Sequence, residues 1–232
     1  MSQQHQLVAI LFTDIVGYTA LMQENELNAV GLIKHYNSSL NKLVALHGGK
    51  VLNYYGDGNL CTFSSATSAM NCALELQQDL KSDPHVPLRI GLHVGEIFFE
   101  EEKALGDGVN VASRIQSLGQ ANTILFSRDI FDKIKNHPEF QPVSIGMFDF
   151  KNVEEPVEVF ALANAGLVIP RKEQMSGKLK KNLSNSEKAI QCVQKSFRDH
   201  EVELYFLNVE PLLISLHSDP RFKEILSKIG FK

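Results

Sequence analysis

The sequence is poor in cysteine and has no tryptophan: 232 residues contain three cysteines, Cys61, Cys72 and Cys192. These three are widely spaced, their number is odd and no CxxC pair occurs, so the sequence favours neither a disulfide framework nor a zinc site. Such cysteine usage is ordinary in a reducing compartment, and we expect a cytoplasmic protein.

Long apolar runs are also missing. No run reaches the roughly 18 residues that indicate a membrane span, so none is expected. The N-terminus, MSQQHQ, has neither the basic region nor the apolar region of a signal peptide. A net charge of −4 argues against a general nucleic-acid binder. A hydrophobic fraction of 44% and this chain length allow one sizeable core and an appendage.

Apolar periodicity predicts an α+β or mixed α/β fold, in which strands and helices alternate without strict βαβ regularity. The predicted strands cover residues 7–12, 50–55, 60–63, 88–99 and 123–127, with a closing hairpin over 143–150 and 156–163. The predicted helices cover 20–46 (one long helix or two that abut), 64–80, 109–118 and 128–135. Residues 100–103 are charged and predict a turn. Gly91 and Gly95 within one strand predict a close backbone approach or a bulge.

The composition changes after residue 164. Residues 1–164 carry the alternating pattern and predict one domain, whereas residues 165–186 are rich in lysine and serine and predict a linker. Residues 187–232 have a helical pattern and predict a short C-terminal helical appendage.

Two aspartates lie at the ends of apolar strands. Asp14 ends LVAILFTD, and Asp57 lies between two glycines in a predicted hairpin turn. If these strands are neighbours in one sheet, the two carboxylates meet at one rim, where they repel unless a cation lies between them. Each aspartate alone is a common turn residue. As a pair they indicate Mg²⁺ or a similar ion, which binds one or two carboxylates together with phosphate oxygens.

The turn that follows Asp14 leads into a helix. Its residues are Ile15, Val16, Gly17, Tyr18 and Thr19. Backbone N–H groups at such a turn suit an anionic phosphate, although one glycine before a helix is a weak signal by itself.

Asn110 and Arg114 lie four residues apart in GDGVNVASR, and on a helix they share one face. An amide and a guanidinium on one face suit a sugar and a phosphoryl group in transfer. The other interpretation is the polar outer face of an amphipathic helix, and the two are about equally favoured by this stretch.

The span from about Leu7 to Ala163 resembles the catalytic domain of class III nucleotidyl cyclases, the adenylate and guanylate cyclases. The matching stretches occur in the order and at the spacing of that family: LFTDIVGYT, HGGKVLNYYGDG, LRIGLHVGEI, GDGVNVASRI and FKNVEEPVEVFAL. The resemblance covers about two-thirds of the chain. It implies a ferredoxin-like βαββαβ core, with a mixed sheet covered by helices, that pairs head to tail as a homodimer with active sites at the interface.

The resemblance also implies roles for individual residues. Asp14, Asp57 and the Ile15 carbonyl would hold two divalent cations, Mg²⁺ or Mn²⁺, and Arg89 would contact the triphosphate with the turn at residues 16–19. Asn110 and Arg114 would act on the nucleotide held by the partner's aspartates. The implied reaction converts a nucleoside triphosphate to a 3′,5′-cyclic monophosphate by attack of the ribose 3′-oxygen on the α-phosphorus, releasing pyrophosphate.

The sequence departs from the family at the base pocket. Asn53 stands where adenylate cyclases carry an adenine-reading lysine, and Lys103 stands where its companion is an Asp, Thr or Ser. The lysine near the final hairpin has no clear match, since Val153 or Glu154 falls there. Tyr55, beside Asn53 in the same predicted strand, could narrow the pocket or pack in the sheet.

These departures leave alternatives open. ATP is the family default, but cyclases that make cyclic UMP or cyclic CMP in anti-phage signalling belong to the same superfamily and also lack the purine-reading pair. A catalytically inactive module for nucleotide binding or dimerisation is the main alternative function. A diguanylate cyclase or a palm-type polymerase would need segments that this sequence lacks. The stretch VEPLLISLHSDPRFKEILSKIGF resembles the end of a tetratricopeptide-type array.

Overall fold

The structure is a computed structural model that describes residues 5–100, 103–151, 153, 155–171, 175 and 223, with backbone alone for 99–100 and 103–105. The chain divides into two compact units, Met1–Lys172 and Glu173–Lys232, and the first contains nearly all of the described residues. Most of the predicted linker lies outside the described residues, as does the predicted helical segment 187–232 with its tetratricopeptide-like stretch, apart from residue 223.

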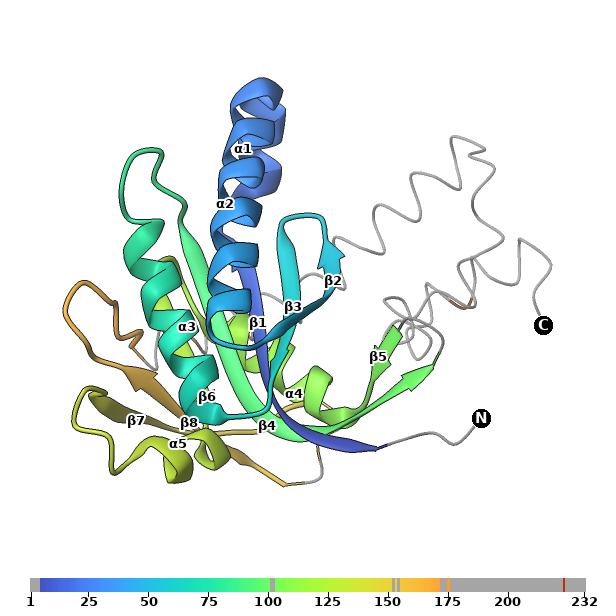
Figure 1. Ribbon diagram of the computed structural model, residues 1–232, viewed down its shortest axis with the longest axis vertical. Helices are drawn as coiled ribbons and strands as arrows, with labels where there is room; N and C mark the ends of the chain where they lie inside the picture. Colours follow the sequence, from blue (N-terminus) through green and yellow to red (C-terminus); the bar gives the residue numbers. More distant parts are fainter. Residues whose placement is uncertain are drawn as a thin grey trace. The chain divides into compact units, whose positions relative to one another are not determined.

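One large sheet organises the first unit (Figure 1). Its strands are β1 (Gln6–Ile15), β2 (Lys50–Tyr55), β3 (Gly58–Phe63), β4 (Leu88–Glu100), β5 (Lys103–Leu105), β6 (Thr123–Ser127), β7 (Pro142–Phe148) and β8 (Val157–Leu162). The spatial order is β2-β3-β1-β4-β6-β8-β7, and β5 pairs with the end of β4. β4 and β6 are parallel, whereas the other neighbouring strands are antiparallel. The order β2-β3-β1-β4 is that of a ferredoxin-like core, so the predicted α+β fold is confirmed.

The helices are α1 (Tyr18–Glu24), α2 (Glu26–Leu46), α3 (Ala66–Asp79), α4 (Asp107–Leu118) and α5 (Arg128–Ile134). The region predicted as one long helix or two contains two, α1 and α2. Asn25 separates them because its backbone is extended, at φ −154° and ψ 93°, while its side chain accepts from the Asn28 N–H at 3.0 Å. This side-chain cap satisfies a free donor at the start of α2. Ser65 caps α3 in the same way.

The two faces of the sheet pack against different helices. Side chains such as Ile90 and Leu92 are fully buried in the main core with α2 and α3, whereas Gly91 between them faces α4. A Cβ atom at Gly91 would lie 2.4 Å from the Gln116 nitrogen and 2.6 Å from the Ala112 carbonyl oxygen. This contact confirms the predicted close approach, because only glycine leaves room for the α4 backbone.

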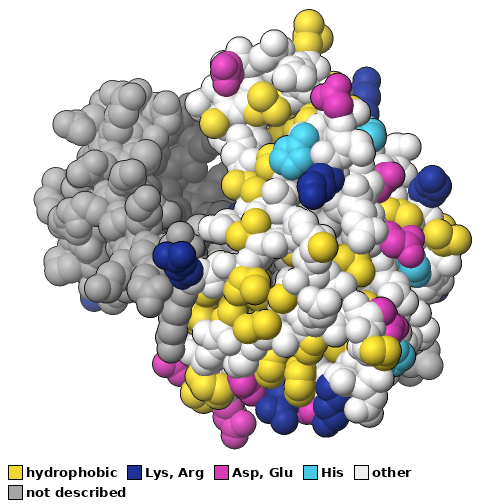
Figure 2. Space-filling view, turned by 90° about the vertical axis from the view of Figure 1, so that its left-hand side faces the viewer, with side chains coloured by type: hydrophobic (Ala, Val, Ile, Leu, Met, Phe, Trp, Pro, Cys, Tyr) yellow, Lys and Arg dark blue, Asp and Glu magenta, His cyan; other side chains and the backbone are white. Residues whose placement is uncertain are grey.

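No helix in the described part of the chain is long and apolar enough to cross a membrane. On the face drawn in Figure 2, acidic, basic and apolar side chains are interspersed over the described surface, without a broad field of one sign. A general nucleic-acid interface would concentrate positive charge on one face. The face drawn in Figure 2 therefore gives no support to such a partner.

Candidate active site

Five neighbouring strands contribute one residue each to a row at the rim of the sheet. Across β2, β3, β1, β4 and β6, the register aligns Tyr55 with Gly58, Gly58 with Asp14, Asp14 with Arg89, and Arg89 with Thr123. Residues opposite one another in a sheet project from the same face. This rim row therefore points to the side of the sheet on which α4 lies.

The two predicted metal-binding carboxylates meet at this row. Asp57 directly precedes Gly58, and its carbonyl oxygen accepts from the Ile15 N–H at 3.1 Å. Burial raises the pKa of Asp57, and the nearby charge of Asp14 raises it further, although Asp57's own backbone hydrogen bond and Arg89 oppose this shift. A Cβ atom at Gly58 would lie 2.8 Å from the Thr13 carbonyl and 3.5 Å from Asp14 Oδ1. Glycine at this position thus lets the hairpin turn approach Asp14 closely.

Arg89 forms an ion pair with Asp14. Its Nε and Nη2 atoms lie 2.7 and 2.5 Å from Asp14 Oδ2, and both side chains are about three-quarters buried. Both Arg89 nitrogens contact Asp14 Oδ2. The other carboxylate oxygen, Asp14 Oδ1, has no hydrogen-bond donor among the described residues. The sequence alone did not predict this pair, because it depends on the register of β1 against β4.

The groups at the rim suit a small divalent cation. The described residues contain no cluster of three or more His, Cys, Asp and Glu side chains that could enclose a metal. Two carboxylates match Mg²⁺ or Mn²⁺, which complete their coordination with phosphate and water oxygens, whereas the Arg89 guanidinium competes with a cation for Asp14. Asp14 and Asp57 therefore fit the implied metal, with the substrate's phosphate as a necessary further ligand.

The turn after Asp14 offers fewer donors than the sequence suggested. The Val16 N–H donates to the Pro87 carbonyl at 2.8 Å, so it is already engaged and is not a free donor for phosphate. Gly17 has a positive φ of 82° and leads into the short helix α1. The backbone at Gly17, Tyr18 and Thr19 remains the candidate for a triphosphate contact.

A second row lies one step further from the rim on the same face. We call it the inner row: it contains Asn53, Leu60, Phe12, Gly91 and Leu125. The ring of Tyr55, which is 50% exposed, stacks on Phe12 with centroids 5.8 Å apart. Asn53 Oδ1 is buried and has no hydrogen-bond partner among the described residues. Tyr55 therefore both packs and borders the predicted base pocket, whereas the Lys103 side chain lies outside the described part of the structure.

The two predicted catalytic residues lie on α4. Asn110 is exposed, and Arg114 is partly buried, with its Nη1 atom buried and unpaired among the described residues. No described hydrogen bond or ion pair joins either residue to Asp14, Asp57 or Arg89. Within one chain, the two halves of the predicted active site are therefore not in polar contact.

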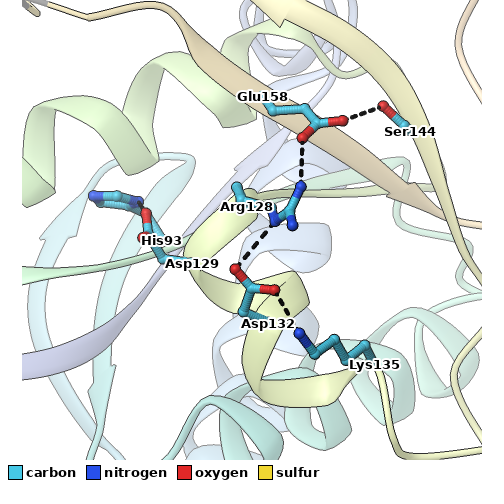
Figure 3. A network of polar contacts seen from close by, with 7 residues as sticks. All are labelled: His93, Arg128, Asp129, Asp132, Lys135, Ser144 and Glu158. Carbon is cyan, nitrogen blue, oxygen red and sulfur yellow. Dashed lines mark hydrogen bonds and ion pairs between the residues drawn. The ribbon is translucent and has the colours of Figure 1, made fainter.

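A second polar cluster, on α5 and on strands β4, β6, β7 and β8, is not a catalytic arrangement (Figure 3). His93 Nδ1 lies 2.9 Å from Ser127 Oγ and 3.6 Å from Asp129 Oδ2. Because one nitrogen faces both partners, the imidazole cannot pass a proton from serine to aspartate in the manner of a triad. Arg128 pairs with Glu158 at 3.1 Å, which joins α5 to β8. This cluster thus has a structural role.

Buried polar side chains lie behind the rim, on the opposite face of the sheet, and the sequence reasoning missed them. The Tyr36 hydroxyl on α2 is hydrogen-bonded to Thr13 Oγ1, which donates to the Asn59 carbonyl at 3.2 Å. Gln77 on α3 donates to two carbonyls at the ends of β4 and β6 at 3.0 and 3.1 Å. The sequence offered one signal for these contacts: in each of these helices, a side chain with a polar group occupies a position on the apolar, inward face.

These features together define a class of protein: an α+β domain with a carboxylate pair at the rim of its sheet and a separate Asn/Arg helix face, suited to chemistry on phosphate esters. Residues 1–164 match the adenylate and guanylate cyclase catalytic domain, and the chain belongs to that family.

The comparisons with individual proteins agree with this assignment. Putative adenylate cyclase 3 of Rhizobium meliloti is 36% identical over 167 residues, which cover 68% of this chain and 28% of that protein. A crystal structure of an adenylate/guanylate cyclase/hydrolase from Silicibacter pomeroyi is 29% identical with a TM-score of 0.64, covering 69% of this chain and 98% of that one. The adenylyl cyclase CyaB from P. aeruginosa, 22% identical, shares the fold with a TM-score of 0.64, covering 74% and 98%. The match thus spans less than a third of the first relative.

Proposed function

We propose that this chain is the catalytic part of a nucleotidyl cyclase that makes a 3′,5′-cyclic nucleoside monophosphate for second-messenger signalling. The observation that carries the proposal is the rim of the sheet, where Asp14 pairs with Arg89 and Asp57 lies in the adjoining turn, near enough for both charges to act on its pKa. Family membership gives the reaction type, and the rim gives the charged groups that the reaction needs.

Asp14, Asp57 and the Ile15 carbonyl would hold two divalent cations, Mg²⁺ or Mn²⁺. Bound there, such ions neutralise the phosphate charge and lower the pKa of the attacking hydroxyl. Arg89 already lies at the rim and would exchange Asp14 for an oxygen of the triphosphate, since a guanidinium binds phosphate as readily as carboxylate.

The reaction is an in-line displacement at the α-phosphorus. The ribose 3′-oxygen forms the new P–O bond, its proton is lost, and the bond to the β-phosphate breaks to release pyrophosphate. Asn110 orients the ribose and Arg114 stabilises the negative charge on the phosphoryl oxygens. Catalysis of this kind depends mostly on positioning and charge neutralisation.

We further propose that the active enzyme is a head-to-tail homodimer. The exposed Asn110 and the unpaired Nη1 of Arg114 make no polar contact with the rim of their own chain, which supports a role toward a second copy. A two-fold axis would then form two sites, each with aspartates from one protomer and the α4 residues from its partner.

The base remains the open part of the proposal. ATP is the family default, and the Rhizobium meliloti relative carries the name of an adenylate cyclase. Asn53, with an unpartnered Oδ1, can accept or donate toward several bases, so UTP or CTP, with a product for anti-phage signalling, stays open. A binding-only module is the competing function. The departures at Asn53 and Lys103 motivate it, whereas the retention of the metal-binding and catalytic set argues against it, because a binding-only module needs no transition-state arginine.

Incubation of the purified chain with Mn²⁺ and each of the four nucleoside triphosphates tests the proposal. We expect chromatography to identify a cyclic monophosphate from at least one of them. Tight nucleotide binding in calorimetry, with no product from any of the four, would instead establish the binding-only module.

A further inference from the structure

Helix α2 contacts all three strands that carry or flank the metal-binding carboxylates. Tyr36 is bonded to Thr13 on β1, Asn37 Oδ1 accepts from Asn59 on β3 at 3.1 Å, and Asn41 Oδ1 accepts from Tyr54 on β2 at 2.7 Å. We call Tyr36, Asn37 and Asn41 the α2 clamp. In Figure 1, α2 runs along this edge of the sheet, beside β1, β3 and β2.

The contacts of the α2 clamp lie next to the carboxylates in register. Thr13 and Asn59 are opposite one another, and the next pair toward the rim is Asp14 with Gly58. Because successive side chains of a strand alternate between faces, Thr13 and Asn59 point toward α2 while Asp14 points to the other side. The clamp therefore holds strand positions next to Asp14 and two residues from Asp57, from the face opposite to Asp14.

The deepest of these contacts has a defined direction. The Thr13 hydroxyl gives its proton to the Asn59 carbonyl, so it accepts from the Tyr36 hydroxyl. All three residues have no exposed surface, and burial raises the pKa of Tyr36, so the phenol keeps its proton and remains the donor. These buried hydrogen bonds are directional, whereas the surrounding apolar contacts are less so, and among the described residues only Asn59 Oδ1 of this group lacks a partner.

We propose that the α2 clamp is a positioning device that keeps Asp14 and Asp57 close together before a metal arrives. Two adjacent carboxylates repel, and this repulsion tends to separate the end of β1 from the β2–β3 turn. The hydrogen bonds from one rigid helix to the three strands oppose that separation. This inference rests on the proposed metal site.

A matched pair of variants on α2 tests the proposal. Tyr36→Phe removes the hydroxyl that is bonded to β1. Ser39→Ala removes a second buried hydroxyl, which donates to Asp79 on α3 at 2.5 Å and touches no strand of the metal site. Both changes delete one buried hydrogen bond, so they should lower the thermal stability of the full chain by similar amounts.

The affinity for Mn²⁺ distinguishes the two variants without requiring turnover. It is measured by electron paramagnetic resonance in the presence of inorganic tripolyphosphate. We expect Tyr36→Phe to weaken Mn²⁺ binding about tenfold, as the loss of an outer partner of a metal ligand does elsewhere. Ser39→Ala should bind as the wild type does. Equal Mn²⁺ affinity in Tyr36→Phe and the wild type, or equal weakening in both variants, would overturn the positioning role.

Two further outcomes are distinguishable. If Tyr36→Phe does not fold, Asn37→Ala decides, because Asn37 is only partly buried. We expect weaker Mn²⁺ binding than in the wild type, and an unchanged affinity would overturn the inference. If the wild-type chain binds no Mn²⁺ in the presence of tripolyphosphate, the proposed metal site is wrong. The positioning role is then wrong as well, because it depends on that site.

Discussion

The rim row and the inner row lie side by side on one face of the sheet but differ in their chemistry. In the rim row, charges pair within the chain, as Asp14 and Arg89 do at 2.5 Å. In the inner row, Asn53 presents a buried oxygen without a partner beside an aromatic stack. Triphosphate and metal are common to all nucleotide substrates, whereas the base is not. We therefore expect the rim to determine the reaction and the inner row to determine the substrate.

Removing a rim carboxylate should have the largest effect. Asp57→Asn keeps the side chain's size but removes its charge, so we expect cyclase activity with Mn²⁺ to fall about a thousandfold or more. Because burial and Asp14 raise the pKa of Asp57, the neutral amide should leave the melting temperature unchanged or higher at pH 7. Activity assays and thermal unfolding measure the two quantities; more than a tenth of the activity remaining would contradict the account.

Truncation of the α4 arginine should come next. Arg114→Ala removes the charge proposed to act on the phosphoryl group in transfer, and we expect kcat to fall about a hundredfold or more. KM should change little, since the interaction strengthens in the transition state. Steady-state kinetics separate the two parameters. A rise in KM with unchanged kcat would place Arg114 in ground-state binding instead.

Removal of the Arg89 side chain should weaken nucleotide binding and tighten metal binding. Arg89→Ala removes a phosphate contact, so KM for the nucleotide should rise about tenfold. The same change frees Asp14 from its ion pair, so binding of Mn²⁺ without nucleotide should tighten. Arg89→Lys serves as the control that keeps the charge. Weaker Mn²⁺ binding in Arg89→Ala would show that the ion pair supports the metal site and does not compete with it.

The smallest effect is expected in the inner row. Asn53→Ala should change the ratio of kcat/KM values among the four nucleoside triphosphates by about tenfold, because a polar contact to the base is lost for some bases only. Mn²⁺ binding should stay the same. An equal loss for all four substrates would remove Asn53 from base selection and weaken the distinction between the two rows.

The sequence was sufficient for features that depend on local pattern. It predicted β6 at residues 123–127 and the Gly-Asp-Gly turn before β3, because apolar runs and glycine-flanked turns are local signals. It also predicted that Asp14 and Asp57 would meet, on the condition that their strands pair, and β1 does pair with β3.

Features that depend on register or tertiary packing were not predicted. The short strand β5 was missed, since three residues carry no periodic pattern. The Val16 N–H was assigned to phosphate but is occupied by Pro87 across the turn. The sequence did not predict that Tyr36 contacts Thr13, next to Asp14. Helical periodicity shows which face of a helix is buried, but not which strand that face contacts.

The central claim is that one active site needs residues from two chains, and a mixing experiment tests it most directly. Chains of all 232 residues that carry Asp57→Asn or Arg114→Ala, each inactive alone, are combined and allowed to exchange subunits. Half of the dimers are then mixed, and each mixed dimer has one intact site of two, so the account predicts recovery of about a quarter of the wild-type activity. No recovery, with mixed dimers verified by differential tags, would contradict it.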